Sequence, residues 1–376
     1  MTKPFYDFKR RVKHIDGGLL SGRFAAFMPV FFALMLSSFP AAAQPVKPVK
    51  MPAGYKYFDA AEELFSRGDF QQAIEQLDLA VRKNPRFAQA FNYRGVIKRN
   101  LERYDDAIMD FSKAIEISPT YADALNNRGI SKYRLRKYIE STDDFNAALA
   151  IEPGAADFHA NRAKAYFALG SATEALKSYD MAARLNSRDP EVFKSRGDIY
   201  MAKQLYDYAK DDYNTALRLD SAFAVAYLSR CQLYLVINKA DSAVVDANYY
   251  IKLRPSEPDG YYWRGKSLMQ RGSYELAIDN FGLTLDRNPR FIEAYIGRGQ
   301  AFDGMGKYLM STDEYTKAIN VDQSVWEAYY YRGLSNKRLG HPDQARTDLE
   351  AALQLNPKND IIRNELAQLK TAAEKK

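Results

Sequence analysis

Small and hydrophobic residues recur along the chain in a fixed pattern from Gly54 onward. A small residue is followed four positions later by an aromatic residue or leucine, and this pair returns at one constant interval, with a single unit skipped. The pairs are Ala73/Leu77, Ala107/Phe111, Ser141/Phe145, Ala175/Tyr179, Ala209/Tyr213, Ala277/Phe281, Ser311/Tyr315 and Ala345/Leu349. A spacing of four places both side chains on one face of a helix. The pattern therefore predicts helices that repeat with a constant period.

Two further markers keep the same period. An arginine recurs at this interval without a gap, usually before glycine, and we call this set the arginine ladder: Arg94, Arg128, Arg162, Arg196, Arg230, Arg264, Arg298 and Arg332. A proline closes most units, at Pro85, Pro119, Pro153, Pro255, Pro289 and Pro357. Pro190 follows a unit that lacks this proline and Pro258 follows Pro255, and we expect each at the first position of the next helix, where a missing N–H costs nothing.

Together these markers resemble the tetratricopeptide repeat, which combines small, aromatic and proline residues with a period of about 34 residues. The resemblance covers residues 54–359, as nine consecutive units of equal length. It implies an all-α, right-handed superhelical solenoid in which each unit is a helix-turn-helix. Glycine or another small residue at position 8 of the first helix is expected to face a small residue at position 20 of the second. Aromatic residues at positions 4, 11, 17 and 24 are expected to fill the space between helix pairs.

Two positions depart from this pattern in a way that predicts local repacking. In the sixth unit, Ala247 replaces the aromatic residue of the second helix and Tyr250 replaces a later alanine. Such a pair of opposite exchanges keeps the total volume roughly constant. Cys231 takes the small-residue position of the same unit and is expected to be buried rather than reactive.

The two ends of the chain carry other signals. Ile361, Ile362, Leu366 and Leu369 fall on one helical face, so residues 360–376 are predicted to form a helix that caps the open end of the stack. Residues 1–43 combine a basic start, the uncharged run 24–36 and an ending in alanines, which is typical of a secretory signal peptide. The alternative is that residues 24–43 are retained as a membrane anchor. Residues 44–53 are proline-rich and are predicted to be a linker.

The charge of the chain changes once this leader is considered. The formal net charge is +7, but residues 1–43 hold six basic and two acidic residues, which leaves +3 for the rest. Little positive charge remains to neutralise phosphates, so binding to nucleic acid is not expected. One cysteine and three histidines provide no metal-site pattern, and no catalytic motif is present. We predict that the chain is not an enzyme and that it has no cofactor and no metal site. We expect His159 to be a packed core residue.

Eight arginines at one position suggest either a structural role or a row of anion-binding side chains. Acidic residues recur sixteen positions after six of them, at Asp110, Asp144, Asp212, Asp246, Glu314 and Asp348. Pairing between the two sets along the repeats favours the structural interpretation.

In the family that the chain resembles, the first helices line a concave groove. The corresponding residues here include an apolar group in the middle of the chain, Met201, Val225, Leu228, Leu235, Val236, Tyr262 and Met269. A basic group accompanies it, Arg134, Lys164, Lys194 and Lys266. Both groups are candidate partner-binding residues. The alternative for the apolar group is that the altered sixth unit turns these side chains into the core.

These observations favour a non-enzymatic interaction scaffold of the bacterial cell envelope, periplasmic or secreted, that binds an extended peptide or helix of another envelope protein. A second hypothesis is an assembly factor anchored in the inner membrane, with membrane contact only if residues 24–43 are retained. A third is a module that binds an envelope polysaccharide through Tyr262, Tyr330, Gln232 and Gln300. The sequence specifies neither the partner nor the oligomeric state.

Overall fold

A computed structural model describes residue 51 and residues 53–185 and 188–374 of the chain. These residues form nineteen α-helices and, within the described ranges, no strand. The helices are α2 (Tyr55–Arg67), α3 (Phe70–Lys83), α4 (Ala88–Asn100), α5 (Tyr104–Ile117), α6 (Ala122–Arg134), α7 (Tyr138–Ile151), α8 (Ala156–Ala168), α9 (Ala172–Arg184), α10 (Pro190–Ala202), α11 (Tyr206–Leu219), α12 (Ala224–Val236), α13 (Ala240–Leu253), α14 (Pro258–Gln270), α15 (Tyr274–Arg287), α16 (Ile292–Gly304), α17 (Tyr308–Val321), α18 (Trp326–Arg338), α19 (Pro342–Leu355) and α20 (Asp360–Glu374).

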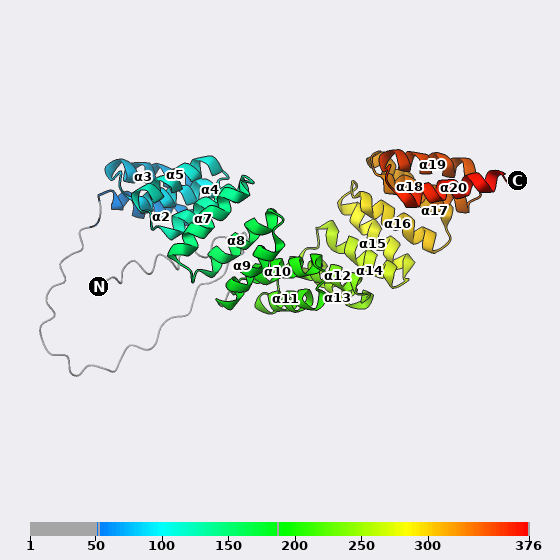
Figure 1. The fold of residues 1–376 in the computed structure, drawn as a ribbon, viewed down its shortest axis with the longest axis horizontal. Helices are drawn as coiled ribbons and strands as arrows, with labels where there is room; N and C mark the ends of the chain where they lie inside the picture. The colour runs from blue at the N-terminus through cyan, green and yellow to red at the C-terminus, as the bar shows by residue number, and fades with distance from the viewer. Residues whose placement is uncertain (1–50, 52, 186–187, 375–376) are drawn as a thin grey trace, which may run out of the picture. The chain divides into compact units, whose positions relative to one another are not determined.

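The predicted all-α solenoid of helix-turn-helix repeats is confirmed. Helices α2 to α19 form nine pairs, in which an even-numbered first helix packs against the odd-numbered second helix that follows it. Each second helix then packs against the first helix of the next pair, so the pairs follow one another in chain order (Figure 1). Pro190 and Pro258 begin α10 and α14, as expected from their position in the sequence.

The core of most repeats forms where a small residue of the first helix admits an aromatic ring of the second helix. A Cβ atom added to Gly95 would lie only 2.6 Å from the ring of Phe111, and one added to Gly197 would lie 2.7 Å from the ring of Tyr213. The sequence correctly predicts that position 8 must be small. The nearest neighbour is mainly the position-24 ring, however, and less the position-20 residue that we expected there.

The sixth repeat is repacked, as its sequence predicts. Ala247 and Tyr250 are both buried in α13. The ring of Tyr250 packs where the next first helix carries Gly260, since a Cβ atom added to Gly260 would lie 2.7 Å from it. Cys231 is fully buried and packs against Ala243 and Ala247. The glycine at position 260 therefore makes room for the displaced aromatic ring.

The turn between the two helices of a repeat uses a left-handed residue at position 15. Five repeats have glycine there, at Gly68, Gly170, Gly272, Gly306 and Gly340. The other four have a non-glycine residue with φ between 57° and 60°, at Glu102, Arg136, Gln204 and Asn238. The same backbone conformation is thus imposed in all nine repeats, whatever residue occupies the position.

The C-terminal helix covers the last pair. Ile362, Leu366 and Leu369 of α20 are buried against Leu349 and Ala352 of α19. At the other end, the predicted leader and nearly all of the predicted linker lie outside the described residues. Every helix in the described ranges is too short or too polar to traverse a bilayer.

Candidate functional site

The arginine ladder pairs with the recurring acidic residues inside each repeat. The guanidinium of Arg196 on α10 donates from Nε to Asp212 Oδ2 at 2.8 Å and from Nη2 to Asp212 Oδ1 at 2.6 Å. Arg94, Arg128, Arg230 and Arg332 contact both oxygens of the equivalent carboxylates, and Arg298 contacts Oε2 of Glu314 through both Nε and Nη2. These carboxylates are buried, so each pair is largely withdrawn from water. A bidentate contact of this kind fixes the register of the two helices of a repeat.

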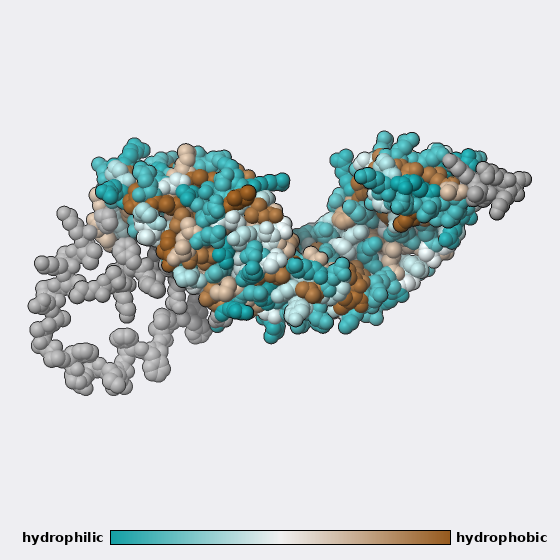
Figure 2. Space-filling model, viewed as in Figure 1, coloured by the Kyte–Doolittle hydropathy of each residue, from teal (hydrophilic) through white to brown (hydrophobic). Residues whose placement is uncertain are grey.

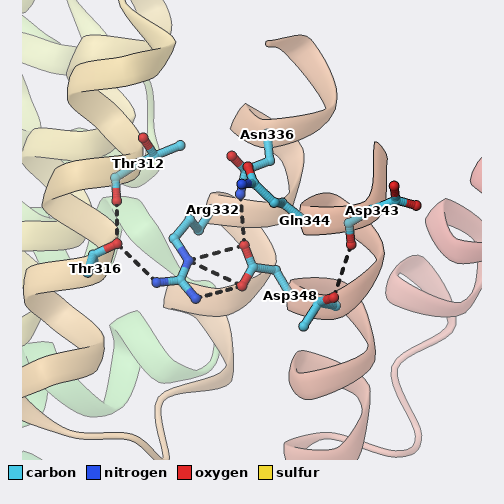
Figure 3. Close-up of a pocket in the computed structure, with 8 residues that line it drawn as sticks. Thr312, Thr316, Arg332, Asn336, Asp343, Gln344 and Asp348 are labelled. Atoms are coloured by element: carbon cyan, nitrogen blue, oxygen red, sulfur yellow. Dashed lines mark hydrogen bonds and ion pairs between the residues drawn. The ribbon is translucent and has the colours of Figure 1, made fainter. Parts of the chain in front are cut away.

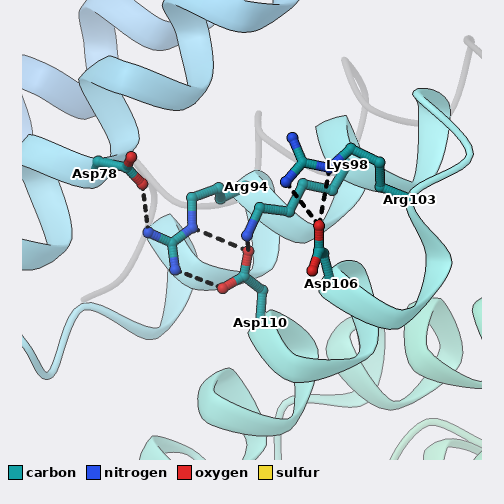
Figure 4. Close-up of polar contacts among 6 residues, drawn as sticks. All are labelled: Asp78, Arg94, Lys98, Arg103, Asp106 and Asp110. Carbon is teal, nitrogen blue, oxygen red and sulfur yellow. Dashed lines mark hydrogen bonds and ion pairs between the residues drawn. The ribbon is translucent and has the colours of Figure 1, made fainter.

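The ladder also joins neighbouring repeats. The third nitrogen of Arg94, Nη1, donates to Asp78 of the preceding second helix at 2.6 Å, so the guanidinium bridges α3 and α5 (Figure 4). Lys98 adds a second contact to the same Asp110 carboxylate at 2.8 Å. Equivalent links to the preceding repeat come from Arg128, Arg196, Arg230 and Arg332. The sequence predicts the pairing within repeats, but it does not reveal this link between them.

Two ladder arginines lack a carboxylate partner in the described structure. Arg162 contacts Ser178 at 3.1 Å, Asn146 at 3.1 Å and the ring of His159 at 3.5 Å. Arg264 contacts Asn280 at 2.6 Å and Asn248 at 2.9 Å. Burial lowers the pKa of Arg264, whereas hydrogen bonds to Asp212 raise the pKa of Arg196. The two guanidinium groups therefore have very different surroundings at the same repeat position.

The ladder lies in surface grooves between consecutive second helices. Around Arg332 such a groove forms an open pocket of about 480 Å³. Thr312 and Thr316 of α17 form one wall, Asp343 and Gln344 of α19 form the other, and Arg332 lies between them (Figure 3). Arg264 lies between α13 and α15 in a comparable way, because it contacts Asn248 of α13 and Asn280 of α15.

The first helices form a second candidate surface, which we call the first-helix face. Consecutive first helices contact one another directly, for example α12 with α14 and α14 with α16. The asparagines Asn92, Asn127, Asn126 and Asn161 tie α4, α6 and α8 together by hydrogen bonds of 3.1 Å. The sequence gives no sign that these amides contact one another, because the two members of each pair lie in different repeats.

The predicted apolar group divides into two parts. Met201, Leu228, Leu235, Tyr262 and Met269 are half-buried and pack against the core clusters of their repeats. These five side chains contribute to the core of their repeats, and part of each remains at the surface. Val225 and Val236, at the two ends of α12, are 42% and 51% exposed. Only these two members offer a largely accessible apolar surface.

The predicted basic group is spread over four first helices, with Arg134 on α6, Lys164 on α8, Lys194 on α10 and Lys266 on α14. Lys194 is paired with Asp198 at 2.9 Å, and Asp198 also accepts a hydrogen bond from Tyr213. Lys266 differs because burial lowers its pKa, and it has no ion pair among the described residues. A half-buried ammonium in this state favours a carboxylate from outside.

The buried histidine and the cysteine of the described residues have structural surroundings. His159 is buried and one ring nitrogen, Nε2, lies 3.0 Å from the carbonyl oxygen of Pro153, as expected for a core histidine. Burial raises the pKa of the Cys231 thiol to about 12, so the residue is a poor nucleophile. No group of three or more potential metal ligands is found within the described ranges.

The comparisons with known proteins identify the repeat. A tetratricopeptide-repeat family model matches residues 58–122 and 126–190, and a second such model matches residues 326–359. These segments are tetratricopeptide repeats. The matched segments lie in both the N-terminal and the C-terminal parts of the helix-pair array. A search of curated proteins returned no match.

Solved structures similar to this chain show the same fold. The Cut9–Hcn1 hetero-tetramer matches with a TM-score of 0.52 and 13% identity, covering 86% of this chain and 78% of that one. PilF of Pseudomonas aeruginosa has a TM-score of 0.51 and 20% identity, covering 57% of this chain and 97% of its own. The C-terminal part of a tetratricopeptide-repeat protein from Cytophaga hutchinsonii has a TM-score of 0.50 and 20% identity, covering 63% of this chain and 98% of its own. At these identities the similarity concerns the fold.

Proposed function

We propose that this chain is a non-enzymatic scaffold of the bacterial cell envelope that binds an extended peptide or a helix of a partner protein on the first-helix face. Tetratricopeptide repeats generally mediate protein–protein interactions, and the similar Cut9 structure is a complex with a second protein, Hcn1. The envelope location rests on the leader-like composition of residues 1–43.

The observation that carries the proposed site is the combination on α12 and α14. Val225 and Val236 expose apolar surface on α12, and the neighbouring α14 carries Lys266, half-buried and without an ion pair in the described structure. A partner segment with a carboxylate between apolar residues satisfies both features, because it covers the valines and neutralises the ammonium. Because the repeats are already folded, binding costs this chain little conformational entropy.

The polysaccharide hypothesis has less support than the protein one. Tyr262 packs against Phe281 and Phe291 with ring centroids 5.9 and 5.0 Å apart, so its ring is committed to the core.

The test is a crosslinking pull-down from the envelope fraction with the intact protein and with a Val225→Glu, Val236→Glu, Lys266→Glu variant. We expect one partner to be lost selectively from the variant. The control is Leu309→Glu, because Leu309 is 72% exposed on α17, away from the first-helix face. Circular dichroism establishes that both variants are folded. Recovery of the same partners with the triple variant contradicts the proposed site.

The same preparation addresses the leader. N-terminal sequencing of the protein recovered from cells is expected to begin near Gln44, after signal-peptide cleavage. An intact N-terminus together with membrane association favours the anchored assembly factor instead.

A further inference from the structure

The surroundings of Arg264, like those of Arg162, lack the negative charge that the other six ladder arginines contact. In six repeats the guanidinium contacts a carboxylate of its own repeat. In the seventh repeat Asn280 takes that place, and Nε of Arg264 donates to its Oδ1 at 2.6 Å. Nη1 donates to Asn248 at 2.9 Å, and Nη2 has no hydrogen bond within the described ranges. A cation remains in the groove with only neutral amides as partners.

A second arginine increases the positive charge at this place. Arg287 of α15 stacks on the ring of Tyr261, with its guanidinium carbon 3.8 Å from the ring centroid. The guanidinium of Arg264 lies over the same ring at 5.6 Å. Arg287 also donates to the hydroxyl of Tyr261 at 2.8 Å and to the carbonyl oxygen of Pro255 at 3.0 Å. Both cations are thereby held in place by the protein rather than by an anion.

Apolar side chains are exposed on the two helices that flank the groove. Val245 and Tyr249 of α13 are 51% and 48% exposed, and Leu276 of α15 is 50% exposed. The Tyr249 ring stacks on Tyr227 at 5.0 Å, beside Arg230, so it lies on the side of α13 that faces α11. Figure 2 shows hydrophobic residues reaching the surface in this region of the molecule, around α13. Exposed apolar side chains near a cation without a carboxylate partner are typical of an interaction site.

We propose that the α13–α15 groove is a second binding site, separate from the first-helix face, which receives a single Asp or Glu side chain of a partner protein. The carboxylate lies beside Asn280 and accepts a hydrogen bond from Nη2 of Arg264, as Asp212 and Asp246 do from the equivalent Nη2 in their repeats. Val245 and Leu276 contact apolar residues on either side of that carboxylate. Glu275 and Asp279 of α15 are exposed on the outer part of the same helix, so a densely acidic segment is repelled.

Substitution of Asn280 separates this proposal from a merely structural role. The Asn280→Asp variant supplies an internal carboxylate to Arg264, as in the six paired repeats. We expect it to raise the melting temperature and at the same time to weaken partner binding, because the internal carboxylate competes with the external one. A structural role alone moves the melting temperature without changing binding.

The experiment selects short random peptides displayed on phage against the intact protein and measures the affinity of the recovered peptides. We expect peptides with one acidic residue between apolar residues. Asn280→Asp and Arg264→Gln are each expected to weaken their binding at least about tenfold, the equivalent of one charge-assisted hydrogen bond. The matched control is Asn214→Asp, which adds the same charge beside Arg230, an arginine that already pairs with Asp246. This control is expected to leave the affinity unchanged.

Three results overturn the proposal: recovery of no binding peptide, recovery of peptides without acidic residues, or unchanged affinity in Asn280→Asp. The first-helix face is intact in all these variants, so unchanged affinity in Asn280→Asp leaves the proposed function standing, whereas recovery of no peptide at all also counts against the proposed function. Conversely, a Val225→Glu, Val236→Glu, Lys266→Glu protein keeps the Arg264 groove and is expected to bind the selected peptides normally.

Discussion

At the scale of single residues, the turn at position 15 shows that the repeat imposes its backbone on unsuitable side chains. The left-handed conformation costs a residue with a Cβ atom about 1–2 kcal/mol, whereas glycine adopts it freely. Four repeats nevertheless place Glu102, Arg136, Gln204 or Asn238 there. The packing of the two helices therefore decides the backbone, and the local preference of the residue yields to it.

This strain predicts that Gln204→Gly stabilises the protein. The gain is expected to be about 0.5–1 kcal/mol, because the extra flexibility of glycine in the unfolded chain offsets part of the relieved strain. Urea unfolding followed by circular dichroism measures it. The reverse exchange, Gly272→Ala, is the control and is expected to lower stability by about 1 kcal/mol. Destabilisation by Gln204→Gly contradicts the interpretation.

Cys231 provides a second prediction at this scale. The thiol is fully buried, and burial raises its pKa to about 12, so almost no thiolate is present near pH 8. A disulfide reagent is therefore expected to react with the folded protein far more slowly than with the protein in urea, and the rate increases with pH up to about 12. Fast labelling of the folded protein at pH 8 is the result that contradicts burial.

At the scale of helices, the arginine ladder is the main polar connection between elements. Sequence alone predicts the pairing in six repeats, since basic and acidic residues recur with one period. It does not predict the hydrogen bond that the arginine Nη1 donates to the preceding repeat. The accepting side chain, at position 25 of that repeat, varies among Asp78, Ser112, Asn146 and Thr316. That contact becomes visible only when α3 and α5, or their equivalents, are placed side by side.

The first-helix face shows where sequence reasoning reaches its limit. Residues at equivalent repeat positions share a face, yet Leu228 is half-buried in the core while Val225 of the same helix is exposed. Helical periodicity assigns both to one surface. Their difference depends on how Tyr227 and Tyr250 fill the sixth repeat, and the altered volume of that repeat follows no family pattern.

The pair Arg196 and Asp212 tests the structural role of the ladder. Removal of either side chain leaves the other charge in a largely buried place, so Arg196→Ala and Asp212→Ala are each expected to cost about 3 kcal/mol. The double variant is expected to lose clearly less than the sum of the two. Denaturant unfolding of all four proteins gives the coupling energy, and partner binding is measured in parallel. Loss of binding with unchanged stability favours a direct role of the ladder in recognition.

Arg298 allows the complementary test, in which a contact is added. Within the described residues it donates no hydrogen bond to the preceding repeat. Position 25 of that repeat is Gly282, and an added Cβ atom there has room, with Nη1 of Arg298 3.9 Å away. Gly282→Asp is expected to raise the free energy of unfolding by about 1–2 kcal/mol, from helix propensity and a new charged hydrogen bond. In an Arg298→Gln background only the propensity part is expected to remain. An equal gain in both backgrounds contradicts the proposed contact.

At the scale of the whole helix array, stability comes from contacts between successive elements. Each helix pair contacts mainly the pair before and the pair after it, so the fold is approximately a one-dimensional series of coupled units. In such a series the ends are weakest, because an end unit has one neighbour. The sequence predicts a cap at the C-terminus for this reason, and α20 covers the last pair with three buried side chains.

The position of the cap predicts where the array opens first. Ile362 of α20 is fully buried, and its neighbour Ile361 is 63% exposed. Ile362→Ala removes apolar volume from the interface with α19 and is expected to cost about 2–4 kcal/mol there. Because coupling acts between neighbours, α18 and α19 are expected to lose protection against hydrogen exchange, while α4 to α9 keep theirs.

Hydrogen exchange measured by mass spectrometry distinguishes this behaviour from a single cooperative core. Ile361→Ala is the matched control, since an exposed side chain next to the same site contributes little to stability. If Ile362→Ala lowers protection equally in all nine helix pairs, the array unfolds as one unit, and a cost at the cap is shared by every repeat. If the loss of protection is confined to α18–α20, opening of the chain end does not change the stability of the candidate surfaces on α12–α15. Partner binding at those surfaces then persists when the cap has opened.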